Sequence, residues 1–162
     1  QKKYANGVNT HLSQHDKECE FIIVGQDTDS SMTPDDLNMG CCVGRNKPFS
    51  WIGWRGMNRE DCVRDQRKQL VGLKPIDPNK WLPEGAQLVF NTKQAIPMTM
   101  VGHVTSSYLH NSLGYSFAMG VVKGGLNRMG ERVFAPLADG SVIEAEIVSS
   151  VFFDPKGERQ NV

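Results

Sequence analysis

The strongest constraint on the fold is an Asp139-Gly140 pair that lies between two runs of strand-forming residues, 133–137 and 141–149. An Asp-Gly pair between such runs is typical of the tight turn of a β-hairpin. Apolar and acidic residues alternate over residues 143–147 of the second run. Because successive side chains of a strand point to opposite faces, the alternation predicts a sheet with one buried face and one solvent-facing side.

Four further strands are expected before this hairpin, at residues 70–73, 86–90, 98–107 and 116–122. The segments between them are rich in Pro, Gly, Asp and Asn, which favour turns. Short strands at this spacing predict a mainly β fold with a few short helices (α+β), organised as a small antiparallel β-barrel or sandwich. Phe152 and Phe153 are expected to fill one end of a barrel.

The segment before the barrel is expected to combine one strand with two short helices. The Phe-Ile-Ile-Val run at residues 21–24 ends at Gly25 and predicts a buried strand. Thr33 before Pro34 predicts the capped start of a helix that Gly40 ends. A second, largely polar helix is expected at residues 54–63.

Three regions follow from these patterns. Residues 1–17 are polar and show no period of 2 or 3.6, so we expect a poorly ordered leader. Residues 18–66 form the strand-helix connecting segment, and residues 67–162 form the C-terminal barrel domain.

Composition narrows the classes of function. The chain has 18 basic and 18 acidic residues, which argues against a nucleic-acid surface made by bulk charge. It has no 18-residue apolar run, and its first residues lack the apolar core of a signal peptide, so no membrane association is expected. Its four cysteines match neither a disulfide framework nor a zinc motif, so we expect reduced thiols in a cytoplasmic protein; they are Cys19, Cys41, Cys42 and Cys62.

Several candidate metal sites are better explained by ordinary turns and surface side chains. Residues 27–31 resemble the start of a calcium loop, but the sixth and twelfth positions are Met32 and Asn38, so an Asx-type turn is the better prediction. His11 and His15 are expected to be a surface pair without a third ligand.

His103, within an expected strand, and His110, in the loop after it, are more typical of structural histidines than of catalytic bases. Residues 122–125 (Val-Lys-Gly-Gly) favour a turn over a phosphate-binding loop. We find no nucleophile-base pair and no metal cluster in the sequence, which disfavours a complete small enzyme.

Two charged residues offer weak local signals for ligand binding. Glu18 precedes the expected strand at residues 21–24, where its carboxylate could accept hydrogen bonds from the N–H groups of a heterocycle. Lys47, between Arg45 and Pro48 in the neighbourhood of the expected helices, could offer positive charge to a carboxylate-bearing ligand. The alternative for both is a solvated surface charge.

Three groups of short motifs carry a family resemblance. They are residues 21–27 (Phe-Ile-Ile-Val-Gly-Gln-Asp) with Thr33-Pro34; residues 102–108 (Gly-His-Val-Thr-Ser-Ser-Tyr) with Leu113-Gly114 and Phe117-Ala118; and residues 128–131 (Arg-Met-Gly-Glu) with Ala138-Asp139-Gly140 and residues 152–157 (Phe-Phe-Asp-Pro-Lys-Gly). Over residues 18–162 the chain resembles the C-terminal part of the glycine-cleavage T-protein (aminomethyltransferase) family. Within it, the chain is most similar to the branch of heterotetrameric sarcosine oxidase α subunits.

The resemblance implies tetrahydrofolate as the cofactor, with the pterin-binding glutamate on Glu18 and a basic folate contact on Lys47. Lys47 replaces the Arg common in T-proteins, and Asp16 and Glu20 also depart from the family pattern around Glu18. The family's catalytic aspartate falls upstream of residue 18, so no catalytic residue is assigned in this chain. NAD and flavins are expected only in the parent enzyme.

Two functions remain open at this point. One is the C-terminal portion of a folate-binding domain that transfers one-carbon units within an oxidoreductase or aminomethyltransferase, inactive by itself. The other is an interaction or assembly barrel that packs against other domains or subunits without touching ligand. Both imply upstream domains or other subunits as partners, an exposed apolar patch, and a tendency to self-associate.

Overall fold

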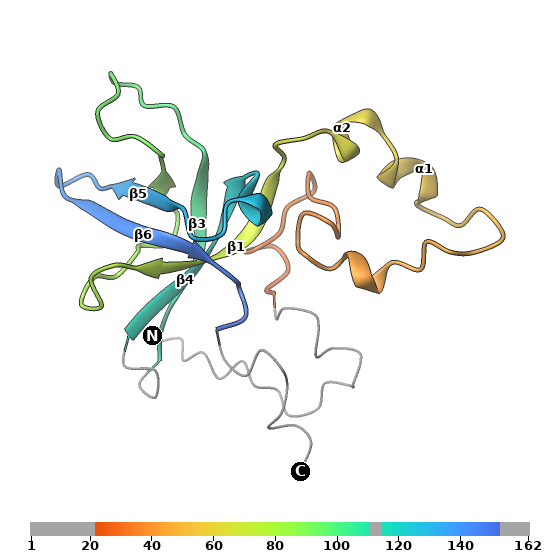
Figure 1. Cartoon of the computed structure of the whole chain (residues 1–162), viewed down its shortest axis with the longest axis horizontal. Helices are drawn as coiled ribbons and strands as arrows, with labels where there is room; N and C mark the ends of the chain where they lie inside the picture. The colour runs from red at the N-terminus through yellow and green to blue at the C-terminus, as the bar shows by residue number, and fades with distance from the viewer. Residues whose placement is uncertain (1–21, 111–114, 153–162) are drawn as a thin grey trace, which may run out of the picture.

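The structure is a computed structural model, and it describes residues 22–110 and 115–152. Its strands are β1 (Lys68–Pro75), β2 (Gln87–Leu88), β3 (Gly102–His110), β4 (Tyr115–Lys123), β5 (Arg132–Pro136) and β6 (Val142–Val148). Its helices are α1 (Trp54–Met57) and α2 (Glu60–Val63), with 3-10 turns η2 (Gly40–Cys42) and η3 (Gly125–Asn127). The strands gather on one side of the molecule and both α-helices extend away from them (Figure 1).

The strands form one six-stranded antiparallel sheet that closes almost completely on itself. The strand order is β2-β3-β4-β1-β6-β5, so β2 and β5 are the two edges. These edges meet where Val89 and Phe134 exchange two backbone hydrogen bonds, each of 2.9 Å. The predicted small antiparallel barrel, in a mainly β fold with short helices, is therefore confirmed.

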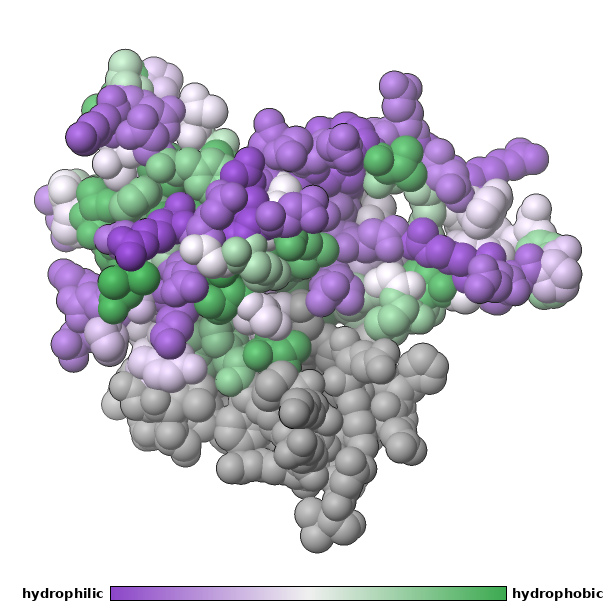
Figure 2. All heavy atoms as spheres, in the orientation of Figure 1, coloured by the Kyte–Doolittle hydropathy of each residue, from purple (hydrophilic) through white to green (hydrophobic). Residues whose placement is uncertain are grey.

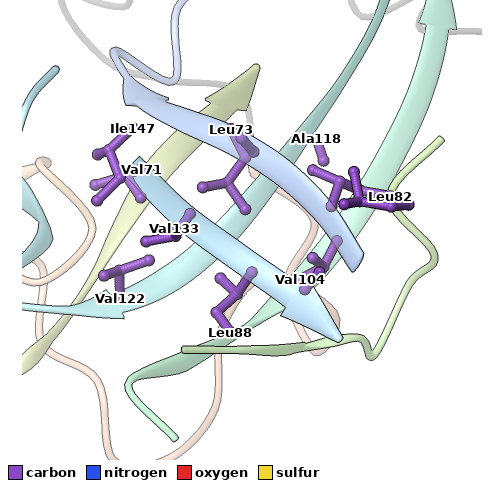
Figure 3. Close-up of a cluster of buried hydrophobic side chains, with 12 residues drawn as sticks. Val71, Leu73, Leu82, Leu88, Val104, Ala118, Val122, Val133 and Ile147 are labelled. Atoms are coloured by element: carbon purple, nitrogen blue, oxygen red, sulfur yellow. The ribbon is translucent and has the colours of Figure 1, made fainter. Parts of the chain in front are cut away.

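The barrel encloses a continuous apolar core (Figure 3). The predicted alternation in the last strand holds, because Ile143, Ala145 and Ile147 are buried and the residues between them are partly exposed. Leu82, from the loop between β1 and β2, is 1% exposed and packs in the same core. The core consists of Val71, Leu73, Leu82, Leu88, Val104, Ala118, Val122, Val133, Ala135, Ile143, Ala145 and Ile147.

The strands occur in the predicted order, and the first or last residues of some strands differ from the prediction. The Asp139-Gly140 turn is present, with Leu137 N–H donating to Ser141 C=O at 2.8 Å and Gly140 at a φ of 81°. The expected strand at 86–90 shortens to β2, and the expected strand at 98–107 shifts to β3. His110 is consequently the last residue of β3 and does not lie in the loop after it.

The predicted buried strand at residues 21–24 is wrong for the part that the structure describes, which begins at Ile22. Ile23 C=O accepts from the N–H groups of Gln26 and Asp27, and Gly25 has a φ of 88°, so the chain turns here. Val24 is 85% exposed. The long-range contacts of Asp27 described below fix this turn in spite of the local β-propensity.

The helix predicted after Thr33 is also shorter than expected. Thr33 and Asp36 cap each other, but Asn38 adopts a φ of 58° and ends the segment after one turn, before Gly40. The second predicted helix, at residues 54–63, is present as two pieces. Arg59, between α1 and α2, has the extended backbone angles φ −63° and ψ 146° that separate them.

Phe152 does not fill the end of the barrel as predicted. Its ring packs on the outer face, 4.2 Å from the centroid of Phe117, and it lies over the backbone of Gly72. Phe153 lies outside the described residues. In the described ranges, we find no helix with the length and apolar character needed to cross a membrane.

Gly102 begins β3 where two strands approach too closely for a side chain. A Cβ atom at this position would overlap the backbone carbonyl of Val121 on β4. We expect Gly102→Ala to lower the free energy of unfolding by about 3 kcal/mol, because neither backbone can move without breaking the β3–β4 pairing. Urea unfolding followed by circular dichroism measures this change.

Gly56→Ala is the matched control. Gly56 lies in α1, and a Cβ there has no heavy atom within 4 Å. We expect it to leave stability unchanged or raise it by about 0.5 kcal/mol. Equal unfolding midpoints for the two variants would contradict the steric argument.

Candidate functional site

Residues 22–39, called the anchor segment below, attach to the outer face of the barrel. Leu37 packs with Leu70 of β1 and with Met119 and Val121 of β4 in a second buried cluster. Leu70 N–H also donates to Asp36 C=O at 2.7 Å, which fixes the segment in register with β1. The outer face of the central strands is therefore covered by protein and is not solvated.

Asp27 joins the anchor segment to β3 through a buried carboxylate. Only 1% of Asp27 is exposed, and its Oδ1 accepts from the hydroxyls of Thr105, at 2.5 Å, and of Ser106. Its Oδ2 accepts from Ile23 N–H at 2.9 Å. Since all three partners are donors, the carboxylate serves as a structural acceptor, and the strand residues of the predicted family motif supply its hydroxyls.

A β-bulge in β3 produces this arrangement. The register between β3 and β4 shifts between Val104 and Ser106, so Thr105 is the extra residue. Ser106 then lies opposite Met119 on the outer face, while Ser107 lies opposite the inward Ala118 and donates to Leu82 C=O. The same short stretch therefore fastens the anchor segment outside and the Leu82 loop inside.

Asp29 forms the turn that the sequence predicts for residues 27–31. Its Oδ1 accepts from Ser31 N–H at 2.7 Å and from the Ser31 hydroxyl at 2.5 Å, and these bonds hold its pKa below the usual value. This Asx-type turn confirms the interpretation preferred over a calcium loop. Among the residues that the structure describes, no three His, Cys, Asp or Glu side chains gather in a way that could hold a metal ion.

Arg67 connects the anchor segment, β1 and the polypeptide that leads into it. Its guanidinium donates to both carboxylate oxygens of Asp36 at 2.8–3.0 Å, with 9% and 3% of the two side chains exposed. It also donates to Ser31 C=O at 2.5 Å and to the backbone and side chain of Asp61 at 2.7 and 3.0 Å. The hydrogen bonds to Asp36 raise the pKa of Arg67, so the buried cation stays charged.

The sequence interpretation missed both of these attachments. Asp36 and Arg67 lie 31 positions apart, and Asp27 lies 78 positions from Thr105. Only the local part of the first attachment had a signal in the sequence. Thr33 and Asp36 have the spacing of a reciprocal helix cap, which predicts that the Asp36 carboxylate turns back toward Thr33 but does not indicate Arg67 as its partner.

Residues 40–66, called the arm below, project from the barrel beyond the anchor segment (Figure 1). Its exposed surface mixes apolar side chains with strongly hydrophilic ones (Figure 2). An open hollow of about 270 Å³ lies on the arm. Its walls are Arg45, Lys47, Pro48, Phe49, Ser50, Trp51 and Trp54.

Lys47 is the cation that faces this hollow. Its Nζ atom lies 5.8 Å from the ring centroid of Trp51, and within the described ranges it takes part in no ion pair. Arg45 differs, because its guanidinium lies 2.6 Å from both carboxylate oxygens of Asp35. The charge of Lys47 is therefore the one available to an anionic group of a ligand.

The aromatic wall of the hollow is formed by two indoles. The ring centroids of Trp51 and Trp54 lie 6.0 Å apart at an interplanar angle of 73°, an edge-to-face arrangement. A cation beside aromatic faces suits a ligand that carries both a ring system and a carboxylate. The hollow is open, so it can form one wall of a pocket.

The remaining predicted site residues fall in different places. Glu18, His11 and His15 lie outside the described residues, and the structure describes only the backbone of His110. His103 is half-buried on β3, and burial, followed by the charge of Lys68, lowers its pKa below the usual value. Its imidazole is consequently neutral at neutral pH.

The barrel matches a known protein family. Residues 68–154 match the family described as the glycine cleavage T-protein C-terminal barrel domain. These residues include every strand of the barrel and exclude the arm.

Curated relatives extend the similarity upstream. The chain is 41% identical over 143 residues to the sarcosine oxidase subunit alpha of Corynebacterium sp. (strain U-96), covering 87% of this chain and 14% of the relative. It is 31% identical over 141 residues to the protein of the same name from Rhizobium meliloti (strain 1021), covering 86% of this chain and 14% of the relative. The chain thus spans about one seventh of the length of these relatives.

Solved structures show similarity as well, among them the glycine cleavage system aminomethyltransferase T from Bartonella henselae, with a TM-score of 0.41 and 29% sequence identity. The similarity covers 51% of this chain and 21% of the other.

We expect Asp27→Ala to destabilise the fold by about 2–4 kcal/mol, because it removes three hydrogen bonds to a charged acceptor and leaves buried donors unsatisfied. Asp29→Ala, at an exposed turn, should cost less than about 1 kcal/mol. Urea unfolding gives both values, and hydrogen exchange in residues 22–39 should rise only in the Asp27 variant. Similar losses in the two variants would argue against the anchoring role.

Proposed function

Because the chain belongs to the glycine cleavage T-protein C-terminal barrel domain family, we propose that it is the C-terminal portion of a tetrahydrofolate-binding domain. We place it in a sarcosine oxidase α-subunit-like enzyme that transfers one-carbon units to folate in the cytoplasm. The chain would contribute binding residues, and the rest of the enzyme would contribute the catalytic ones. NAD and flavins would belong to the remainder of the enzyme.

The observation that carries this proposal is the position of Lys47 beside the indoles of Trp51 and Trp54. A reduced folate combines a flat heterocycle and an aromatic ring with carboxylates, which are the groups that this wall suits. When bound, the cofactor would supply the nitrogen atoms that accept the one-carbon unit. Lys47 would hold a carboxylate, and the indoles would shield the rings from water.

Glu18 is proposed as the second folate contact. It precedes the described residues and is assigned through the family resemblance, as the acceptor of hydrogen bonds from pterin N–H groups. The attachments of Asp27 and Asp36 fix the segment that follows it, and this supports a defined path toward the pocket. The Asp27 and Arg67 contacts are thus proposed to position the two folate contacts relative to the barrel.

A titration of a stable reduced folate by calorimetry tests this proposal. We expect weak binding to the 162-residue chain and tighter binding to a protein that includes the upstream region of its relatives. In the longer protein, Lys47→Ala should weaken binding about tenfold, or about 1.4 kcal/mol, and Glu18→Gln by a similar factor. Lys93→Ala, at an exposed lysine outside the hollow, is the matched control and should change nothing.

Two results would contradict the proposal. One is equal, tight binding by the short and long proteins, which would show that this chain holds a complete site. The other is an unchanged affinity of the Lys47 variant, which would remove the hollow from the folate site.

A second function, assembly onto other domains or subunits of the parent enzyme, is favoured by the apolar side chains of the arm. Ile52 is 101% exposed, Phe49 67%, Val63 62% and Trp54 41%. Large apolar side chains clustered on a projecting segment are typical of a surface that contacts protein. The two functions are compatible, because a ligand could lie between the arm and its partner.

We expect the isolated chain to self-associate through the arm, and Ile52→Glu to reduce this by removing an exposed apolar contact. Light scattering during size-exclusion chromatography measures the average mass across protein concentrations. Val142→Glu, at a residue 44% exposed on β6, is the control and should leave association unchanged. A monomeric wild-type chain at high concentration would contradict the assembly surface, as would equal effects of the two variants.

A further inference from the structure

Charge is divided unevenly along the chain, and the positive part lies on the arm. Residues 40–59 contain the basic residues Arg45, Lys47, Arg55 and Arg59 and no acidic residue. The whole chain has as many acidic as basic residues, so the rest of the sequence carries a compensating excess of negative charge. A local excess of one sign on a projecting segment attracts a partner of the opposite sign.

Two of these cations have no counter-charge within the molecule. Arg45 pairs with Asp35, and Lys47 faces the hollow. Arg55 in α1 and Arg59 before α2 are both exposed, and neither forms an ion pair with the residues that the structure describes. Both lie outside the walls of the hollow, so the folate proposal does not use them. A guanidinium without an internal partner can donate paired hydrogen bonds to the carboxylate of another molecule.

A large apolar side chain is presented beside these cations. Trp54 N–H donates to Trp51 C=O at 3.1 Å, which closes a turn whose central residues are Ile52 and Gly53. Gly53 has a φ of 95°, and Ile52 at the crest of the turn is 101% exposed. Exposed indoles and guanidinium groups around an aliphatic side chain have the composition that protein interfaces favour.

We propose that the arm binds an acidic, amphipathic segment of a partner protein. Carboxylates of this segment would pair with Arg55 and Arg59, and its apolar side chains would cover Ile52. The inference rests on the assembly function proposed above and adds the chemistry of the partner. Burial of apolar surface would supply most of the affinity, and the charges would supply selectivity.

Extended anionic partners, a nucleic acid or a membrane surface, fit the charge distribution less well. A long polyanion or an anionic bilayer reaches past the arm and meets the rest of the chain, whose negative excess repels it. α1 and α2 have four residues each, too few for the amphipathic helix that lies in a membrane interface. A short acidic segment of a protein can contact the arm alone.

Fluorescence anisotropy with two labelled synthetic peptides tests the inference. One peptide combines Leu and Glu at the spacing of an amphipathic helix, and the other has Gln in place of every Glu. We expect the 162-residue chain to bind the Glu peptide about tenfold more tightly than the Gln peptide. This preference should decrease as salt is added, because salt screens exposed charges.

Variants assign the preference to the arm. Arg55→Gln and Arg59→Gln should each weaken binding of the Glu peptide about threefold and leave the Gln peptide unaffected. Ile52→Ser should weaken binding of both peptides, since it removes the shared apolar contact. Lys93→Gln removes one positive charge from an exposed residue outside the arm and should change neither affinity. Circular dichroism establishes that each variant keeps the β-sheet signal.

Equal affinities for the Glu and Gln peptides would overturn the acidic partner and leave the apolar assembly surface in place. The inference is also wrong if Lys93→Gln weakens binding as much as the two arginine variants do. Tighter binding to phosphatidylserine vesicles or to single-stranded RNA than to the Glu peptide would contradict it as well. If neither peptide binds, the inference fails, and self-association that Arg55→Gln weakens would identify a second copy of the chain as the occupant.

Discussion

The barrel depends on how its two edge strands meet. A sheet edge leaves backbone N–H and C=O groups without partners, and β2 is too short to cover β5 along its length. The reciprocal hydrogen bonds between Val89 and Phe134 bring the edges together at one point, and this contact turns a curved sheet into an enclosed core. Enclosure places the apolar residues of all six strands inside, so the outer face of β1 and β4 becomes available to the anchor segment.

The buried cation of Arg67 determines where the arm leaves the barrel. Burial of an ion pair removes two charges from water, and this cost offsets much of their attraction. Arg67 reaches Asp36, Ser31 and Asp61, which belong to the anchor segment and to the arm. The Lys47 hollow lies on the arm, so these contacts of Arg67 help to place it relative to the barrel.

The strands of the barrel could be predicted from the sequence more fully than the structure of the anchor segment and the arm. Alternation and turn chemistry are local, so the hairpin at Asp139-Gly140 and the order of strands could be predicted from neighbouring residues. The run at residues 21–24 carried the same local signal and was misleading, because Asp27 draws that segment into a turn through contacts 78 positions away. Lys47 carried only a weak local signal, from its position between Arg45 and Pro48, and the family resemblance was needed to select it.

The bulge in β3 carries a consequence for how this domain tolerates insertions and deletions. Thr105 is the single extra residue that sends Ser106 outward to Asp27 and Ser107 inward to the Leu82 carbonyl. A strand repeats every two residues, so losing one residue here would reverse the faces of all that follow. Related sequences should therefore keep the length of this stretch, because the count of residues in β3 aligns the inside of the barrel with its outer attachment.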